Sequence, residues 1–275
     1  SFSFRLVCAA FAAGIFPASS FALSDAEAAA GRAIFKQYAD AVVGVEMVVT
    51  LKITIGDRAQ PPREQKREVN GTVISPTGLT VTDLGALDPR SSIAPSSGAR
   101  IDEPEYKEVK LRLNDGTEIP AQVVLTDADL DLAFIAPDAP LPEGHRLTVV
   151  NLDDPAKAEL LGNYYDISRA AKVQQRAPAV RLINIVGFIE KPRRFIIATD
   201  YSPSCPVFDP AGHVLGISLR HIANGLQTGL IILPAADVAD IAKQAAAVKP
   251  TPKPAVDAPS AEAPAAEAPP AGKTP

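Results

Sequence analysis

The sequence predicts an all-β fold with one helix near each end. Short segments rich in β-branched residues recur along the chain, separated by turns such as Ser-Pro-Thr-Gly at 75–78 and Asn-Asp-Gly at 114–116. No clear helical pattern lies between these segments, so hairpin-connected strands are expected rather than crossover units. This pattern is typical of a β-sandwich or of β-barrels.

The two predicted helices have recognisable beginnings. Ser24 is an N-cap candidate ahead of an Ala-rich stretch with an acidic first turn, which predicts a helix from 24 to about 41. A second helix is expected over 234–248, where Pro234 stands at the start and its missing N–H costs nothing.

The strand signals are spread over most of the chain. Residues 88–108 are turn-rich and polar, and we expect them to form an exposed loop. Strands are expected within 42–55, 68–84, 109–125, 130–136, 179–190, 193–200, 205–219 and 227–233.

Both ends of the chain differ from the middle. Residues 1–22 carry Arg5, then an apolar run, then small residues, which predicts a secretory signal peptide and an exported, periplasmic or secreted protein. An uncleaved anchor is the alternative; after cleavage no membrane span is expected. Residues 249–275 are almost wholly Pro, Ala, Glu, Lys, Ser and Thr, which predicts a disordered tail.

Composition and spacing argue against several functions. A net charge of -5 gives no reason to expect a nucleic-acid partner. No His or Cys pair has metal-ligand spacing and no Gly-rich phosphate loop is present, so neither a metal nor a cofactor is expected. Once Cys8 leaves with the signal peptide, Cys205 is alone and is expected to be a small buried hydrophobe.

Three stretches in order carry a family resemblance, namely "ISPTGLTVTDLGAL" at 74–87, "TDADLDLAFI" at 126–135 and "YSPSCPVFDPAGHVLGI" at 201–217. With "TGLIILPAADVADI" at 228–241, they resemble trypsin-like serine proteases of the HtrA/Deg type. The resemblance implies a chymotrypsin/trypsin-like double β-barrel. Its predicted units are an N-terminal helix with the first barrel (24–140) and the second barrel with the closing helix (141–248).

The same resemblance places a degenerate catalytic triad in this chain. The position of the catalytic His falls on Gly85, that of the Asp on Asp131, and that of the nucleophilic Ser on Pro203. The family uses the backbone N–H of the nucleophile residue in its oxyanion hole, and proline has none. No histidine precedes Asp131, so the base of a His-Asp-Ser order is missing.

These observations predict an exported, inactive protease homologue that binds a peptide, a protein or a cell-envelope component. Its cleft would lie near Ser202, Ser204 and Cys205, with Asp131 in a structural hydrogen bond to backbone, Thr82 or Ser202. His145, His213 and His221 are expected in exposed or capping positions.

Two alternatives stay open. One is an active endopeptidase in which Ser202, Ser204 or Cys205 replaces the nucleophile, assisted by His213, His221 or a lysine. The other is a spacer role for the barrels, with the tail as the linking element.

Overall fold

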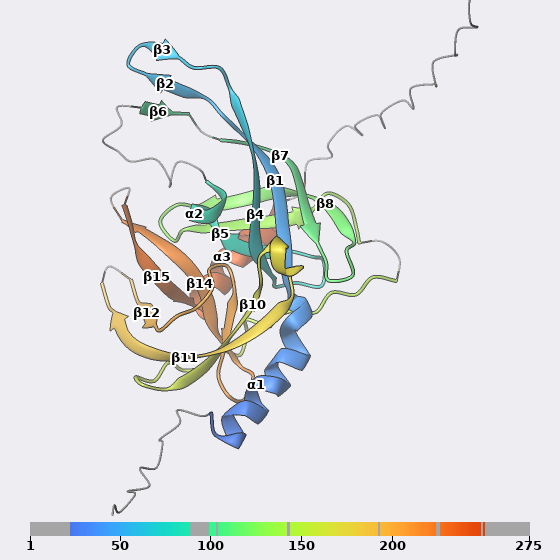
Figure 1. Ribbon diagram of the computed structural model, residues 1–275, viewed down its shortest axis with the longest axis vertical. Coiled ribbons are helices and arrows are strands. Elements are labelled where there is room, and N and C mark those ends of the chain that lie inside the picture. The colour runs from blue at the N-terminus through green and yellow to red at the C-terminus, as the bar shows by residue number, and fades with distance from the viewer. Residues whose placement is uncertain are drawn as a thin grey trace, which may run out of the picture.

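Two closed antiparallel β-barrels and a small open sheet form the fold (Figure 1). The computed structural model describes residues 23–88, 99–102, 104–141, 144–191, 193–223, 226–248 and 250. The all-β double-barrel prediction is therefore confirmed. The predicted signal peptide, and the predicted tail except for Pro250, lie outside the described residues.

Both predicted helices are present. Helix α1 (Asp25–Tyr38) begins with a capping box, in which Glu27 N donates to Ser24 Oγ at 3.2 Å and Ser24 N donates to Glu27 Oε2 at 2.7 Å. The 3-10 helix η1 (Ala39–Ala41) continues it into the first strand. Helix α3 (Ala235–Ala247) follows Pro234 and closes the second barrel. No helix in the described part of the chain is long and apolar enough to span a bilayer.

The first barrel has strand order β1-β4-β5-β9-β8-β7. Its longest ladder joins β1 to β4, from the pair Val42 and Thr72 to the pair Leu51 and Arg63. The elements of this barrel are β1 (Val42–Leu51), β4 (Arg63–Val73), β5 (Thr80–Asp83), the short helix α2 (Leu84–Leu87), β7 (Glu105–Arg112), β8 (Glu118–Asp127) and β9 (Leu132–Pro137).

The second barrel has strand order β10-β11-β12-β15-β14-β13. Helix α1 lies against β10 and β11, where Tyr165 donates its hydroxyl to Glu27 O at 2.8 Å. The elements are β10 (Asn163–Arg169), the 3-10 helix η4 (Lys172–Gln174), β11 (Pro178–Ile189), β12 (Phe195–Ala198), β13 (Pro206–Phe208), β14 (Val214–Ala223) and β15 (Leu226–Pro234).

The open sheet projects from the end of the first barrel and has the order β3-β2-β6 (Figure 1). Its strands are β2 (Ile53–Ile55), β3 (Arg58–Ala59) and β6 (Ala99–Ile101). The prediction of a loop over 88–108 is wrong at its C-terminal end, because β6 and the start of β7 lie there. Backbone pairing with β2 makes this polar segment a strand.

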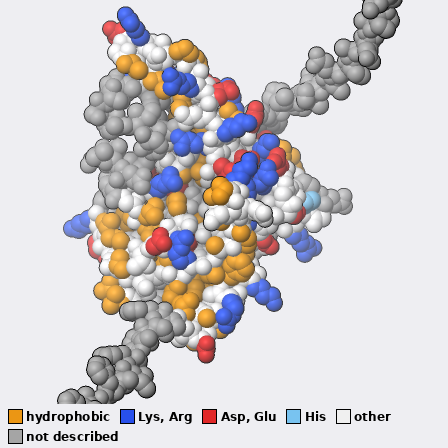
Figure 2. Space-filling model, in the orientation of Figure 1, with side chains coloured by type: hydrophobic (Ala, Val, Ile, Leu, Met, Phe, Trp, Pro, Cys, Tyr) orange, Lys and Arg blue, Asp and Glu red, His pale blue; other side chains and the backbone are white. Residues whose placement is uncertain are grey.

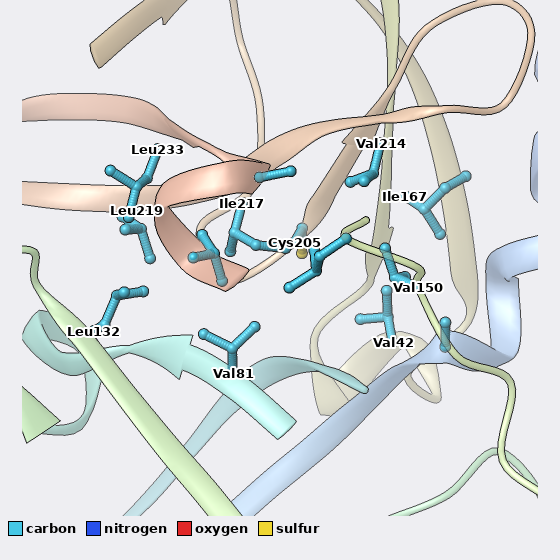
Figure 3. Close-up of a cluster of buried hydrophobic side chains, with 14 of the residues drawn as sticks. Val42, Val81, Leu132, Val150, Ile167, Cys205, Val214, Ile217, Leu219 and Leu233 are labelled. Carbon is cyan, nitrogen blue, oxygen red and sulfur yellow. The ribbon is translucent and has the colours of Figure 1, made fainter. Parts of the chain in front are cut away.

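The largest apolar cluster spans both barrels and holds them together (Figure 3). It contains Val81 and Leu132 from the first barrel and Ile167, Ile217 and Leu233 from the second, all almost fully buried. Burial of an aliphatic side chain of this size contributes about 1.5–3 kcal/mol, so the barrel junction is a major source of stability.

Close backbone contact in the second barrel requires a glycine. A β-carbon on Gly216 in β14 would lie 2.0 Å from Leu233 O in β15, which no side-chain movement can relieve. By contrast, a β-carbon on Gly187 in β11 would meet only Ile197 Cδ1 at 3.7 Å, an ordinary contact.

We therefore predict that Gly216→Ala lowers the free energy of unfolding by about 3 kcal/mol or more, because β14 and β15 must separate. The matched variant Gly187→Ala should stay within about 1 kcal/mol of the parent. Urea denaturation followed by circular dichroism measures both, and equal losses in the two variants would contradict this steric account.

Candidate functional site

The three predicted triad positions all lie where the barrels meet. Gly85 lies in α2, Asp131 directly precedes β9, and Pro203 lies in the turn before β13. Their chain neighbours are linked by hydrogen bonds, since Leu84 N donates to Asp131 O at 2.8 Å and Asp83 N donates to Ser204 Oγ at 3.0 Å. The structure thus brings together segments that are far apart in sequence.

Asp131 contacts an imidazole from the other barrel. Its Oδ2 lies 3.2 Å from Nδ1 of His221, a residue of β14 whose ring also packs against Phe195. The Asp131 side chain is 6% exposed and that of His221 is 22% exposed. The prediction of an exposed or capping His221 is therefore wrong, because the partner of this histidine lies 90 residues away in sequence.

Two of the partners predicted for Asp131, namely Thr82 and Ser202, have other contacts. Thr82 Oγ1 donates to Asn70 O at 2.8 Å and lies 3.2 Å from Ser204 Oγ. Ser202 N donates to Asp166 Oδ2 at 3.3 Å. The Asp131 backbone is left-handed, with a φ of 56°, which is uncommon for a residue with a side chain.

Ser204 connects the two barrels through hydrogen bonds. It is 1% exposed, and its left-handed φ of 67° turns the side chain toward the first barrel. Its hydroxyl accepts from Asp83 N, and its carbonyl accepts from Thr72 Oγ1 at 3.0 Å. Within the second barrel, Ser204 N donates to Ser218 O at 2.7 Å. We call this set of hydrogen bonds the Ser204 bridge.

Asp83 is a fully buried carboxylate beside the Ser204 bridge. Its Oδ1 caps α2 by accepting from Ala86 N at 3.2 Å, and its Oδ2 accepts from Arg220 N at 3.0 Å. Burial raises the pKa of Asp83 to about 6, although these hydrogen bonds and the charge of Arg220 act in the opposite direction.

Asp166 in β10 is a second buried carboxylate, close to the other side of the same turn. Arg181 Nη1 lies 3.7 Å from its Oδ2. Within the described residues, Asp166 Oδ1 and the hydroxyl of Tyr201 have no hydrogen-bond partner. Burial raises the pKa of Asp166 to about 7 and outweighs the attraction of Arg181.

Cys205 is fully buried in the cluster between the barrels, as predicted. Asn70 Nδ2 lies 3.4 Å from its Sγ, and burial raises the pKa of the thiol well above its usual value. A thiol of this kind is protonated at neutral pH and unreactive. His145 and His213 are exposed, as predicted.

No group of three or more His, Cys, Asp or Glu side chains in the described ranges could hold a metal ion. The sequence reasoning also missed Asp83 and Asp166. Asp166 sits in "NYYDISR", a segment that alternation did not mark as a strand because β10 is buried on both faces.

Comparison with known proteins agrees with this architecture. No protein-family model matches the sequence, and no curated protein does. Solved structures do match, and the two closed barrels place this fold in the class of trypsin-like double β-barrels. The crystal structure of Deg5 is similar, with a TM-score of 0.53, 18% sequence identity, and coverage of 79% of this chain and 94% of Deg5. The expected trypsin-like double-barrel fold is therefore confirmed.

The Ser204 bridge makes a stability prediction. Ser204→Ala leaves Asp83 N buried without its acceptor, so we expect a loss of about 1–3 kcal/mol in the free energy of unfolding. Ser204→Gly removes the same hydroxyl but relieves the left-handed backbone, which is worth about 1 kcal/mol, so it should be the more stable of the two. Urea denaturation measures the free energy of unfolding of both variants. If Ser204→Ala is as stable as the parent, the Ser204 bridge does not contribute to stability as proposed.

The two buried carboxylates make a pH prediction. In the folded protein the pKa of Asp83 is about 6 and that of Asp166 about 7, both above the ordinary value of 3.8. Between pH 4 and 7 the folded protein therefore binds more protons than the unfolded chain. The free energy of unfolding therefore falls as pH rises through this range, by a few kcal/mol per group. Asp166→Asn should flatten this slope, whereas the exposed control Asp57→Asn should not. Denaturation at several pH values tests this, and identical slopes would refute it.

Proposed function

We propose that this chain is an exported protease homologue without peptidase activity that binds an extended peptide or protein segment. The Ser204 bridge is the observation that carries the proposal. It fixes the turn in which the family resemblance places the nucleophile, and it uses the Ser204 hydroxyl as a structural acceptor.

The chemistry of a barrel-type protease requires a base within hydrogen-bond reach of an activated hydroxyl. In this chain Gly85 and Pro203 occupy the two expected positions, and neither side chain can take these roles. Pro203 also lacks the backbone N–H of an oxyanion hole, and loss of one such donor costs about 3 kcal/mol of transition-state stabilisation. The buried, protonated Cys205 does not supply a replacement nucleophile.

A peptide partner is supported by the strand edges that the fold leaves open. Closed barrels have no free edges, but the projecting sheet ends at β3 and at β6, and no further strand of the described residues pairs with either of them. An extended segment can add to such an edge through backbone hydrogen bonds, the mode called β-augmentation. The predicted signal peptide supports an exported, periplasmic or secreted location.

A second candidate function is favoured by the contact between Asp131 and His221. A carboxylate on Nδ1 orients an imidazole for base catalysis, as in serine proteases, and here the imidazole comes from the second barrel. This arrangement favours an enzyme with a relocated base. It would require a nucleophile, and the hydroxyl of Ser204 is buried and already accepts a hydrogen bond.

Incubation of the purified protein with a fluorescently quenched unfolded substrate separates the two functions. We expect no cleavage above background and no labelling by fluorophosphonate or iodoacetamide probes, because in the described part of the chain the Ser204 hydroxyl is buried and hydrogen-bonded and the Cys205 thiol is buried and protonated. Cleavage or labelling that disappears in both His221→Ala and Asp131→Asn, with circular dichroism unchanged, would establish the relocated-base enzyme instead.

A further inference from the structure

A trough runs across the outer face of the first barrel, where the β10–β11 turn packs over strand β1. Two cavities of about 540 and 250 Å³ form it, and Lys172 lines both. The outward-facing residues Gly44, Glu46 and Val48 of β1 lie along its floor. We refer to these two cavities together as the trough; Lys and Arg side chains gather in this part of the molecule (Figure 2).

The lining of the trough holds more cations than carboxylates, although the whole chain carries a net charge of -5. Its lining includes three carboxylates, those of Glu46, Glu68 and Glu108, but seven cations. The cations are Lys66, Arg67, Lys110, Arg112, Arg169, Lys172 and Arg176. Charge segregation of this kind favours an anionic partner on this face.

Several of these cations have no carboxylate partner in the described part of the chain. Lys66 and Lys172 are exposed and make no ion pair there, and Arg67 bonds only to the amide oxygen of Gln65. The guanidinium of Arg169 is held by backbone carbonyls, with Nη2 2.9 Å from Ala39 O. Burial lowers the pKa of Arg169 and outweighs the attraction of Asp40, which acts in the opposite direction.

The Arg176 side chain is positioned by the backbone of its turn, by the space above Gly44 and by two glutamates. Gln175 and Arg176 are both left-handed, with φ of 56° and 55°, so the turn bends back over β1. Gly44 leaves room for the guanidinium, since a β-carbon there would lie 3.1 Å from Arg176 Nη1. Arg176 bonds to Glu46 and Glu68, which are opposite each other in the β1–β4 ladder. Two ion pairs and the backbone of the turn therefore fix the position of the Arg176 guanidinium over β1.

We propose that this trough binds an acidic, extended segment of a partner protein. The inference rests on the proposed binding of a peptide or protein segment, and it places an acidic part of that partner in the trough and not at the open edges of β3 and β6. Gly44 to Val48 spans about 13 Å at the rise of a β-strand, so acidic side chains two to four residues apart in an extended peptide would reach both cavities. Carboxylates would lie beside Lys172 and Arg169 in one cavity and beside Lys66 in the other, because Lys66 is opposite the outward-facing Val48 whereas Arg67 is opposite the buried Met47.

The three glutamates in the trough favour a peptide over a uniform polyanion. A nucleic acid or sulfated polysaccharide carries a continuous row of charges and would meet Glu46, Glu68 and Glu108 directly. A peptide can place a neutral residue opposite each glutamate and an acidic residue opposite each free cation. The peptide would bind through its side chains, because β1 already pairs with β4 on one side and with β7 on the other.

Fluorescence anisotropy with a labelled peptide of alternating Glu and Ser, using the full chain, tests the inference. The matched peptide has Gln in place of Glu. We expect binding of the Glu peptide only, weakening as salt rises, and at least tenfold weaker in Lys66→Glu and Lys172→Glu. Both lysines are exposed and without ion pairs, so the variants should fold normally by circular dichroism. Lys191→Glu in the second barrel is the control and should bind like the parent.

The outcomes separate this inference from the proposed function. If the Glu peptide does not bind, or if the Lys66→Glu and Lys172→Glu variants bind it as tightly as the parent does, the proposal of an acidic peptide in the trough is overturned. If the Gln peptide binds as tightly as the Glu peptide, the preference for acidic residues is overturned, while the proposed peptide binding still holds. Tighter binding of heparin or DNA at the same lysines, with no peptide binding, would assign the trough to another polyanion. Cleavage of either peptide would overturn the proposed lack of activity and leave the trough's charge preference unaffected.

Discussion

The hydrogen bonds of Ser204 with the first barrel constrain everything else at the centre of this molecule. Through them a turn of the second barrel reaches Thr72, Thr82 and Asp83, three residues on two strands of the first. The apolar cluster supplies most of the stabilisation between the barrels, but it is not directional. The Ser204 bridge adds direction, because hydrogen bonds with Asp83 N and with two threonine hydroxyls depend on distance and angle and so restrict the relative position of the two barrels.

This constraint has a cost in backbone strain and buried charge. Asp131 and Ser204 both have left-handed backbones, and each such residue costs of order 1 kcal/mol or more. Asp83 and Asp166 lie buried on the two sides of the turn. Such a combination is often found at functional sites, yet here Asp83, Ser204 and Asp131 also make contacts between the two barrels. The free energy lost to strain and desolvation is offset by the large shared core.

The sequence predicted the barrels well because turns and β-branched segments are local signals. It missed β10, whose two buried faces hide the alternation, and β6, which is a strand only through its pairing with β2. The pair of Asp131 and His221 could not be found, because nothing in the local sequence relates two residues on different barrels. The trough was missed for the same reason, since its cations come from separate strands and a turn.

One side chain connects the junction with the trough. Asn70 Nδ2 lies 3.4 Å from Cys205 Sγ and 3.5 Å from Arg169 O, while Asn70 O accepts from Thr82. Arg169 therefore shares a partner with the turn that the Ser204 bridge holds. Asn70 bonds to the backbone carbonyl of Arg169 and not to its guanidinium, so the Ser204 bridge and the trough share the position of the β10 backbone.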